Sequence, residues 1–375
     1  MLFPTTTVGS FPRPDSILKA LRAKRRGDIS AEAFDRAADD AVREVLDLQH
    51  QCGIDIVTDG EQRRDNFYSF VADKLEGVQL MTLAEMLDIV EDKAGFEKIL
   101  QTLDVPAYSI SNPTCVGRIR RREPLAVGEL QFLKEHTDRP VKIPLPGPYL
   151  LTRAMWVPEA TGKVYDSKEH LGQDVVKVLR EEAEALAAAG AEFIQFDEPV
   201  LTELVFSTGA TRTFMCAALA ARNDPAEELE FAVELINQVV DGLTVRTGMH
   251  VCRGNWSRDE STLLQGSYAP LRPYFARMKV DQLVLEYATP RAGELIEVGE
   301  KELGLGCVNP RTDTVETAEE IASRVGEATR FVEREKIFLN PDCGFGTFAS
   351  RPMNEIDAIR SKLKSLVAAA QMLRG

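Results

Sequence analysis

Eight short runs rich in β-branched and other apolar residues alternate with longer amphipathic stretches, and this alternation limits the fold of the chain more than any other feature. Such runs are typical of buried strands in a parallel sheet, and the stretches between them are typical of the connecting helices. The predicted strands are residues 5–9, 54–58, 141–145, 192–197, 245–252, 282–287, 303–308 and 336–341. The predicted helices, with apolar residues at spacings of three and four, are residues 31–51, 168–189, 225–241, 314–335 and 353–373.

Eight such strands in a chain of 375 residues predict an α/β protein, a single (β/α)8 TIM barrel that spans residues 1–375. Residues 77–135 break the alternation, with a helical pair around 82–103 and an extended pair at 105–111 and 115–121. We expect this region to be an insertion after the second strand, because no glycine- or serine-rich linker divides the chain into separate domains.

The charge and composition exclude several classes of function. With 45 Lys and Arg against 59 Asp and Glu, the net charge is −14, which argues against a general nucleic-acid binder. No run of about 18 apolar residues predicts a membrane span, and the N-terminus lacks the features of a secretory signal. Six cysteines are too few for a disulfide scaffold, so we expect a cytoplasmic protein in which Cys52, Cys115 and Cys216 are buried structural residues. The oligomeric state is left open, and a homo-oligomer is compatible with the sequence.

Four metal-binding side chains stand at the predicted carboxyl ends of strands, where barrel enzymes carry their chemistry. His250 and Cys252 are two residues apart in one strand and therefore point the same way, Glu286 ends the sixth strand, and Cys343 follows the last. An imidazole, two thiolates and a carboxylate suit tetrahedral Zn²⁺. An H-x-C pair alone is weak evidence, since cysteines are commonly just buried, but ligands at three converging strand ends predict a zinc site.

Seven segments, in the same order from end to end, resemble the catalytic barrel of the cobalamin-independent methionine synthase family. These segments are TTTVGSFPRP (5–14), DGEQRRDNF (59–67), PLPGPYLL (144–151), IQFDEPVL (194–201), MHVCRGNW (249–256), LEYATP (285–290) and NPDCGFGT (340–347). The resemblance covers nearly the whole chain. It implies a TIM barrel that uses zinc to activate a thiol as the acceptor of an alkyl group.

The resemblance also implies roles for individual residues. Zinc ligands would be His250, Cys252, Glu286 and Cys343. A carboxylate ligand is suited to exchange for the substrate sulfur, and which ligand moves stays open from the sequence. The amino-acid part of homocysteine would contact Gly9, Ser10, Glu61 and Asp197. We therefore take Glu286 and Asp197 as the catalytic candidates. Trp156 would stack on the methyl donor, although its spacing from Pro146-Gly147-Pro148 is about two residues longer than in the family.

Two departures from the family pattern concern the methyl donor. The sequence begins directly at the catalytic barrel, whereas full-length members carry a preceding barrel that helps to bind the folate polyglutamate tail. The family's proton-transferring His after the seventh strand is also missing, because the corresponding stretch is Gly306-Cys307-Val308-Asn309-Pro310. We therefore expect methyl transfer to homocysteine from a donor other than folate polyglutamate, with a corrinoid as one option.

Three alternatives remain open from the sequence. The first is an epoxyalkane:coenzyme M transferase, in which a zinc-activated sulfonate thiol opens an epoxide. Arginines near the predicted strand ends could serve its sulfonate, namely Arg13, Arg63, Arg64, Arg253 and Arg311. The second is a zinc-free barrel decarboxylase or lyase, and the third is a zinc-binding protein without turnover.

Overall fold

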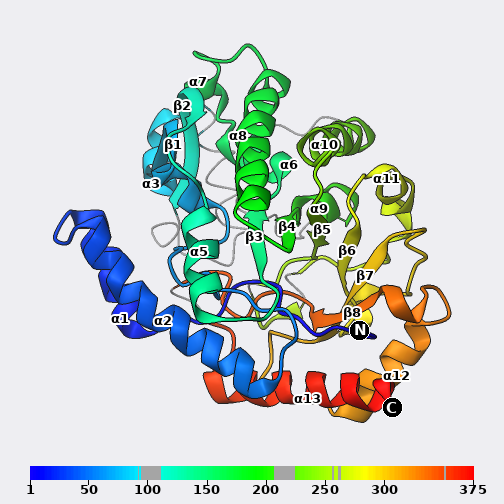
Figure 1. Cartoon of the computed structure of the whole chain (residues 1–375). Coiled ribbons are helices and arrows are strands. Elements are labelled where there is room, and N and C mark those ends of the chain that lie inside the picture. The colour runs from blue at the N-terminus through cyan, green and yellow to red at the C-terminus, as the bar shows by residue number, and fades with distance from the viewer. Residues whose placement is uncertain (92, 94–110, 207–223, 256, 261–262, 350–351) are drawn as a thin grey trace.

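A parallel sheet of six strands forms the centre of the fold (Figure 1). The computed structural model describes residues 1–91, 93, 111–206, 224–255, 257–260, 263–349 and 352–375. The strands lie in the order of the chain: β3 (Lys142–Pro146), β4 (Phe193–Asp197), β5 (Arg246–Val251), β6 (Gln282–Glu286), β7 (Glu302–Val308) and β8 (Ile337–Pro341). Nearly every strand residue is buried, as expected for a parallel sheet covered on both faces. The six predicted strands from 141 onward are thus confirmed to within two residues at each end.

Two short extended segments connect the edges of this sheet through single parallel bridges. Thr5 pairs with Leu339 of β8, Thr6 pairs with Ile56, and Val57 pairs with Val141 immediately before β3. The predicted strands at 5–9 and 54–58 are therefore present only as bridged pairs of residues. Side chains supply part of the pairing, because the Thr5 backbone N–H donates to Asp55 Oδ2 and the Thr6 hydroxyl to the Ile56 carbonyl.

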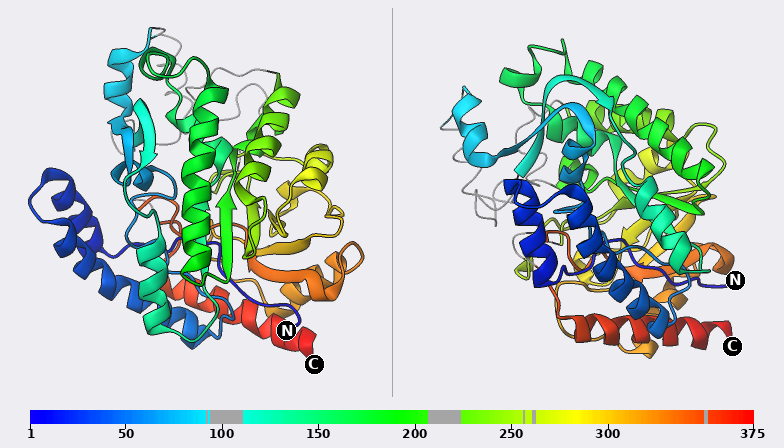
Figure 2. Two further views of the ribbon diagram at one scale, coloured as in Figure 1. Left: turned by 45° about the horizontal axis from the view of Figure 1, so that its top comes forward. Right: turned by 60° about the vertical axis from the view of Figure 1, so that its left-hand side comes forward.

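Helices surround the sheet and follow its strands along the chain (Figures 1 and 2). The helices described before residue 207 of the chain are α1 (Asp15–Arg26), α2 (Ala31–Cys52), α3 (Leu83–Ile89), α5 (Val127–His136), α6 (Pro148–Met155), α7 (Pro158–Thr161), α8 (Lys168–Ala188) and α9 (Val200–Phe206). The later helices are α10 (Pro225–Val240), α11 (Arg272–Arg277), α12 (Ala318–Ala328) and α13 (Ile356–Arg374). Short 3-10 turns are η1 (Ser69–Asp73), η4 (Ala269–Leu271), η5 (Pro290–Ala292) and η6 (Arg334–Lys336).

Four of the five predicted helices match closely, and the one at 314–335 is too long. Its helix, α12, begins after Thr317, whose hydroxyl accepts from the Glu320 backbone N–H in a capping box, and it ends at Ala328. The shorter helices α1, α5, α6, α9 and α11 were not predicted, because two or three turns give too few repeats for a clear period.

The region between the second bridged segment and β3 contains an antiparallel pair outside the parallel sheet. Strand β1 (Leu75–Thr82) pairs with β2 (Ser111–Arg121), and Asn112 pairs with Met81. The predicted strand at 115–121 is confirmed as part of β2, and the predicted strand at 105–111 falls almost entirely outside the described residues. The expected break at 112–114 is wrong, because these residues lie inside β2, whose partner comes earlier in the chain. The predicted helical pair is represented by α3, and residues 94–110 lie outside the described residues.

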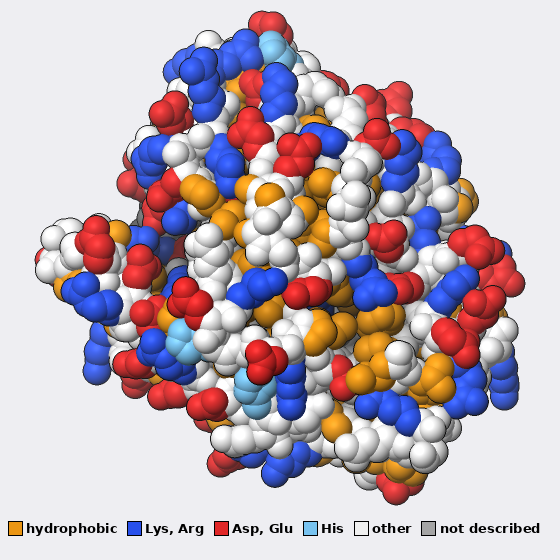
Figure 3. Space-filling model, in the orientation of Figure 1, with side chains coloured by type: hydrophobic (Ala, Val, Ile, Leu, Met, Phe, Trp, Pro, Cys, Tyr) orange, Lys and Arg blue, Asp and Glu red, His pale blue; other side chains and the backbone are white. Residues whose placement is uncertain are grey.

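The two termini lie close together beside α13 (Figure 1). The Arg374 guanidinium donates to the Leu2 and Phe3 carbonyls and pairs with Asp55, so the last helix is attached to the first segment. None of the described helices is both long and apolar enough to cross a lipid bilayer. Acidic and basic side chains are interspersed over the face shown in Figure 3.

Removal of Glu129 tests how far the fold depends on a buried charge pair. Arg64 is 1% exposed and pairs with Glu129, while it donates to the Pro144 carbonyl beside the sheet. Glu129→Ala leaves a buried guanidinium without its carboxylate and should lower the free energy of unfolding by about 3–5 kcal/mol. Denaturant unfolding measures this loss. Asp28→Ala, which breaks the exposed pair with Arg26, is the control and should cost at most about 1 kcal/mol. Equal losses in the two variants would contradict this assignment.

Candidate metal centre

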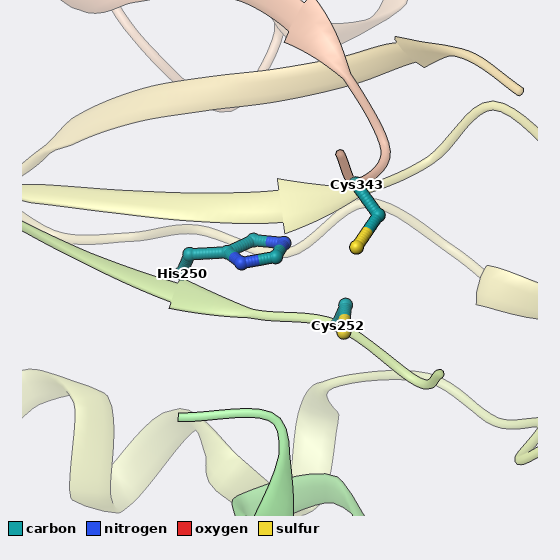
Figure 4. A group of neighbouring side chains, drawn as sticks. All are labelled: His250, Cys252 and Cys343. Carbon is teal, nitrogen blue, oxygen red and sulfur yellow. The ribbon is translucent and has the colours of Figure 1, made fainter. Parts of the chain in front are cut away.

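Three potential metal ligands converge at the carboxyl ends of the strands (Figure 4). His250 is on β5, Cys252 follows that strand, and Cys343 follows β8. One ligand atom from each residue lies within 4.8 Å of the other two, and all three residues are buried. Parallel strands bring their carboxyl ends to the same edge, so residues 91 positions apart meet there, as the sequence predicts.

Hydrogen bonds on both ring nitrogens orient the His250 imidazole. Nδ1 lies 3.0 Å from Asp197 Oδ1, and Nε2 lies 3.2 Å from the Asp342 carbonyl oxygen. Burial by itself lowers the pKa of His250, but Asp197 and the neighbouring Cys252 outweigh it and raise the pKa to about 9. A carboxylate on Nδ1 is the usual outer-shell partner of a histidine that binds a metal through Nε2.

The Cys252 and Cys343 thiols shift each other's pKa in opposite directions. A hydrogen bond from Cys343 lowers the pKa of Cys252, with help from the charge of His250, and the same bond raises the pKa of Cys343. By contrast, burial raises the pKa of Cys307, with smaller contributions from Asp342 and Glu316, and its sulfur faces the Asn340 carbonyl. The lowered pKa of Cys252 favours its thiolate, which is the form of cysteine that binds metals.

Glu286 is at the end of β6, as predicted, but its carboxylate points toward a group of donors. Oε1 accepts from the Arg253 backbone N–H at 3.0 Å, and Oε2 accepts from Asn255 Nδ2 at 2.9 Å and Arg291 Nη2 at 3.2 Å. Burial raises the pKa of Glu286, but the positive charges of Arg291 and Arg253 outweigh burial, so this pKa lies below its ordinary value. Glu286 is not part of the described cluster, and its role as a fourth ligand stays a prediction.

The donor set of the cluster suits zinc. Imidazole nitrogen and thiolate sulfur are the ligands that zinc prefers, and three protein ligands leave a position open for a substrate atom. Nε2 of His250 is the nitrogen suited to bind the metal, because it points toward the cysteines (Figure 4). Its only hydrogen-bond partner among the described residues is the Asp342 carbonyl, whereas Nδ1 is hydrogen-bonded to the Asp197 carboxylate. The residues present therefore fit the metal that the sequence predicts.

Glu61 has the features of a ligand-binding carboxylate. It is 2% exposed, its Oε2 has no hydrogen-bond partner, and the nearest cation, Arg13 Nη2, lies 3.8 Å away. Its backbone has φ of 53°, a left-handed conformation that non-glycine residues rarely adopt and that is often found at functional sites. Burial raises the pKa of Glu61 to about 7, although Arg64 and Arg13 oppose this effect.

Gly9 lies against Glu61, and Ser10 lies against Gly344. A Cβ atom on Gly9 would stand 2.3 Å from Glu61 Oε1, so glycine is required for the carboxylate to pack there. A Cβ atom on Gly344 would stand 2.1 Å from Ser10 Oγ, which places Ser10 beside the loop of Cys343. Gly9 thus packs against Glu61, Ser10 lies beside the loop that contains Cys343, and Asp197 is bonded to His250 of the metal cluster.

Trp156 lies immediately after α6 and is partly buried against the hydrophobic core. Its predicted stacking on the donor stays a prediction. Glu198, which follows Asp197 in the chain, has a structural role, because its carboxylate accepts from the Tyr149 and Leu150 backbone N–H groups at the start of α6.

The sequence interpretation missed several polar partners of the predicted site residues. Asp342 accepts from the Tyr287 and Ala288 backbone N–H groups, and its own carbonyl faces His250. Gln195 donates to Asp197, and both face the same side of β4 because they are two residues apart. That spacing was the available signal for Gln195, whereas nothing local indicates that Arg291 contacts Glu286.

Comparison with known proteins shows the family of the chain. Residues 3–372 match the family described as "Cobalamin-independent synthase, Catalytic domain". The methionine synthase of Saccharolobus solfataricus is 30% identical over 379 residues, covering 100% of this chain and 95% of that relative. The methionine synthase of Thermococcus kodakarensis is 31% identical over 347 residues, covering 92% and 87%.

Solved structures show the same architecture. A B12-independent methionine synthase from Shewanella sp. W3-18-1, in complex with selenomethionine, has a TM-score of 0.76 and 27% identity, covering 100% of this chain and 98% of that one. A putative vitamin-B12 independent methionine synthase from Listeria monocytogenes has a TM-score of 0.70 at 20% identity, with coverages of 100% and 99%, and supports the fold alone. The match along nearly the whole chain, together with the His and Cys cluster, shows that the protein belongs to the cobalamin-independent methionine synthase family.

Proposed function

We propose that this protein is a zinc-dependent methyltransferase that methylates the sulfur of homocysteine to give methionine. The buried cluster of His250, Cys252 and Cys343 carries this proposal, because it brings one ligand nitrogen and two sulfurs together in one place. A zinc ion held there would lower the pKa of an incoming thiol and keep it as the thiolate that attacks a methyl group. The free thiols in the described residues favour a reducing cytoplasm as its location.

We infer that the six strands and the segments around Thr6 and Ile56 together make a (β/α)8 barrel. The three single bridges support this interpretation, because they connect β8 to β3 through the two segments. The antiparallel pair β1–β2 supports an insertion within 77–135 of the single domain 1–375, since it stands apart from the parallel sheet.

Residues around the cluster would bind the amino-acid end of the acceptor. The unpartnered carboxylate oxygen of Glu61 suits the substrate ammonium, while Ser10 and nearby backbone N–H groups suit its carboxylate. Asp197 is less suited than Glu61 to bind the substrate ammonium, because its Oδ1 already accepts from His250 and Gln195. We therefore propose that Asp197 acts mainly by orienting His250.

We favour an amino-acid acceptor over a sulfonate, because Glu61 offers a buried carboxylate oxygen without a hydrogen-bond partner. The five arginines that could serve coenzyme M already have acceptors: Arg13 at backbone carbonyls, Arg63 at Asp39, Arg64 at Glu129, Arg253 at Glu286 and Arg311 at Glu260. A zinc-free decarboxylase or lyase would have no use for the cluster, and zinc analysis of the purified protein separates that reading from ours.

Serine variants of the cysteines test the metal assignment. Cys252→Ser and Cys343→Ser should lose most of the bound zinc and essentially all methyl transfer, because a hydroxyl is a poor replacement for a thiolate ligand. Metal analysis after gel filtration measures the occupancy. Cys307→Ser, which changes a buried cysteine outside the cluster, is the control and should keep its zinc. Full occupancy in both Cys252→Ser and Cys343→Ser would remove the basis of the proposal.

The pKa of Glu61 predicts a pH dependence of ligand binding. Methionine is a suitable probe, because it has the same ammonium and no titrating thiol. Its affinity should rise about tenfold between about pH 6 and about pH 8, as Glu61 ionises with a pKa of about 7. Glu61→Gln should bind methionine weakly, with no such rise. Calorimetry measures both affinities.

The same pKa has the opposite effect on stability in the absence of ligand. The folded protein holds the Glu61 proton between the ordinary value of 4.5 and about 7, so its ionisation costs stability as the pH rises through this range. Glu61→Gln should therefore be more stable relative to wild type at about pH 8 than at about pH 5. In the binding experiment, wild-type methionine affinity of Glu61→Gln at every pH would show that the substrate ammonium binds elsewhere.

Methyltetrahydrofolate triglutamate should be a poor donor. The loop after β7 carries Asn309 and Arg311 and has no histidine to protonate a departing folate nitrogen. Loss of a positioned general acid costs about 10²–10⁴-fold in rate, so a donor with a better leaving group, such as methylcobalamin, should react faster. Thiol loss with each donor measures the difference. A turnover of about 1–10³ s⁻¹ with the folate would contradict this prediction.

A further inference from the structure

We propose that Gln195 and Lys142, two residues in the interior of the sheet, are positioning residues that hold His250 in the orientation required for metal binding. This inference rests on the metal site proposed above. It adds two residues that lie closer to the amino ends of β3 and β4 than the metal cluster does. Neither residue has a ligand-binding atom near the cysteines, and each acts through another side chain.

A continuous series of hydrogen bonds connects these residues with the cluster. Lys142 Nζ donates to Gln195 Oε1 at 3.0 Å, and Gln195 Nε2 donates to Asp197 Oδ1 at 2.9 Å. The same Asp197 oxygen accepts from His250 Nδ1 at 3.0 Å. Strands β3, β4 and β5 are neighbours in the sheet, so the series crosses three strands and ends beside the cluster.

The partners of Gln195 fix which way its amide points. Its Nε2 also donates to the Val8 carbonyl at 3.1 Å, so this atom faces two groups that can only accept. The amide oxygen must then face Lys142, which donates to it whether the amine is charged or neutral. Gln195 therefore presents a donor to Asp197 in one defined geometry, and Asp197 in turn fixes the proton on His250 Nδ1.

Burial makes this arrangement rigid. Lys142 and Gln195 are both 0% exposed, and burial lowers the pKa of Lys142 to about 7. A buried amine or amide that loses its partner pays the cost of desolvation without compensation. The residues thus hold one another in place, and a freely rotating Asp197 carboxylate is excluded while the network is intact.

Another buried glutamine provides a matched control. Gln282 is 0% exposed on β6, but its Nε2 donates to Glu302 and its Oε1 has no partner in the described structure. Among the described residues, its side chain hydrogen-bonds to Glu302 and to neither Asp197 nor His250. Gln282→Leu removes a buried amide from the same sheet and leaves the orientation of His250 unchanged.

The test measures Co²⁺ affinity and the sulfur-to-cobalt charge-transfer band of Gln195→Leu, Gln195→Glu, Lys142→Met and Gln282→Leu. Removing an outer-shell partner typically costs about 10- to 100-fold in metal affinity. We expect losses in this range for both Gln195 variants, a smaller loss for Lys142→Met, and wild-type affinity with an unchanged band for Gln282→Leu. Unfolding in the absence of metal separates these effects from general loss of stability.

A double variant gives the sharpest comparison. Gln195 reaches His250 only through Asp197, so Gln195→Leu should cost no further affinity in an Asp197→Ala background. Wild-type Co²⁺ affinity in folded Gln195→Leu, Gln195→Glu and Lys142→Met would overturn the inference and leave the metal site intact. Failure of the wild-type protein to bind Co²⁺ would overturn both. A Gln282→Leu loss equal to that of Gln195→Leu would also overturn it, because the effect would then be one of general packing.

Discussion

The hydrogen bond between Asp197 and His250 is the interaction on which the candidate site depends. It joins the ends of two neighbouring strands and fixes the imidazole so that its other nitrogen faces the cysteines. Without it, a histidine in this buried position could rotate or hold its proton on the wrong nitrogen. The fold provides this contact because the parallel register pairs Asp197 directly with His250.

Several buried charges around the site are held by partners of opposite charge. Arg253 and Arg291 pair with Glu286, and Arg64 pairs with Glu129. Such pairs add little net stability, because desolvation offsets most of the attraction, but breaking one is costly. The unpartnered oxygen of Glu61, and the coordination position that the three protein ligands would leave open on a bound metal, are therefore the places left for ligands.

The sequence predicts the periodic elements and the clustered ligands well, and fails where long-range contacts decide the outcome. Strands β3–β8 and four long helices follow from apolar periodicity, and the approach of Cys343 to His250 follows from strand order. The pairing of β2 with β1 does not follow, because the two strands are separated by more than 25 residues. The orientation of Glu286 is also hidden, since Arg291 contacts it from a loop without a recognisable pattern.

X-ray absorption at the zinc edge, with and without homocysteine, tests the central claim most directly. Zinc bound by His250, Cys252 and Cys343 should show two sulfur neighbours in the absence of substrate and three after homocysteine is added. Two sulfur neighbours under both conditions, with homocysteine shown to be bound, would contradict the claim that the cluster activates the acceptor thiol.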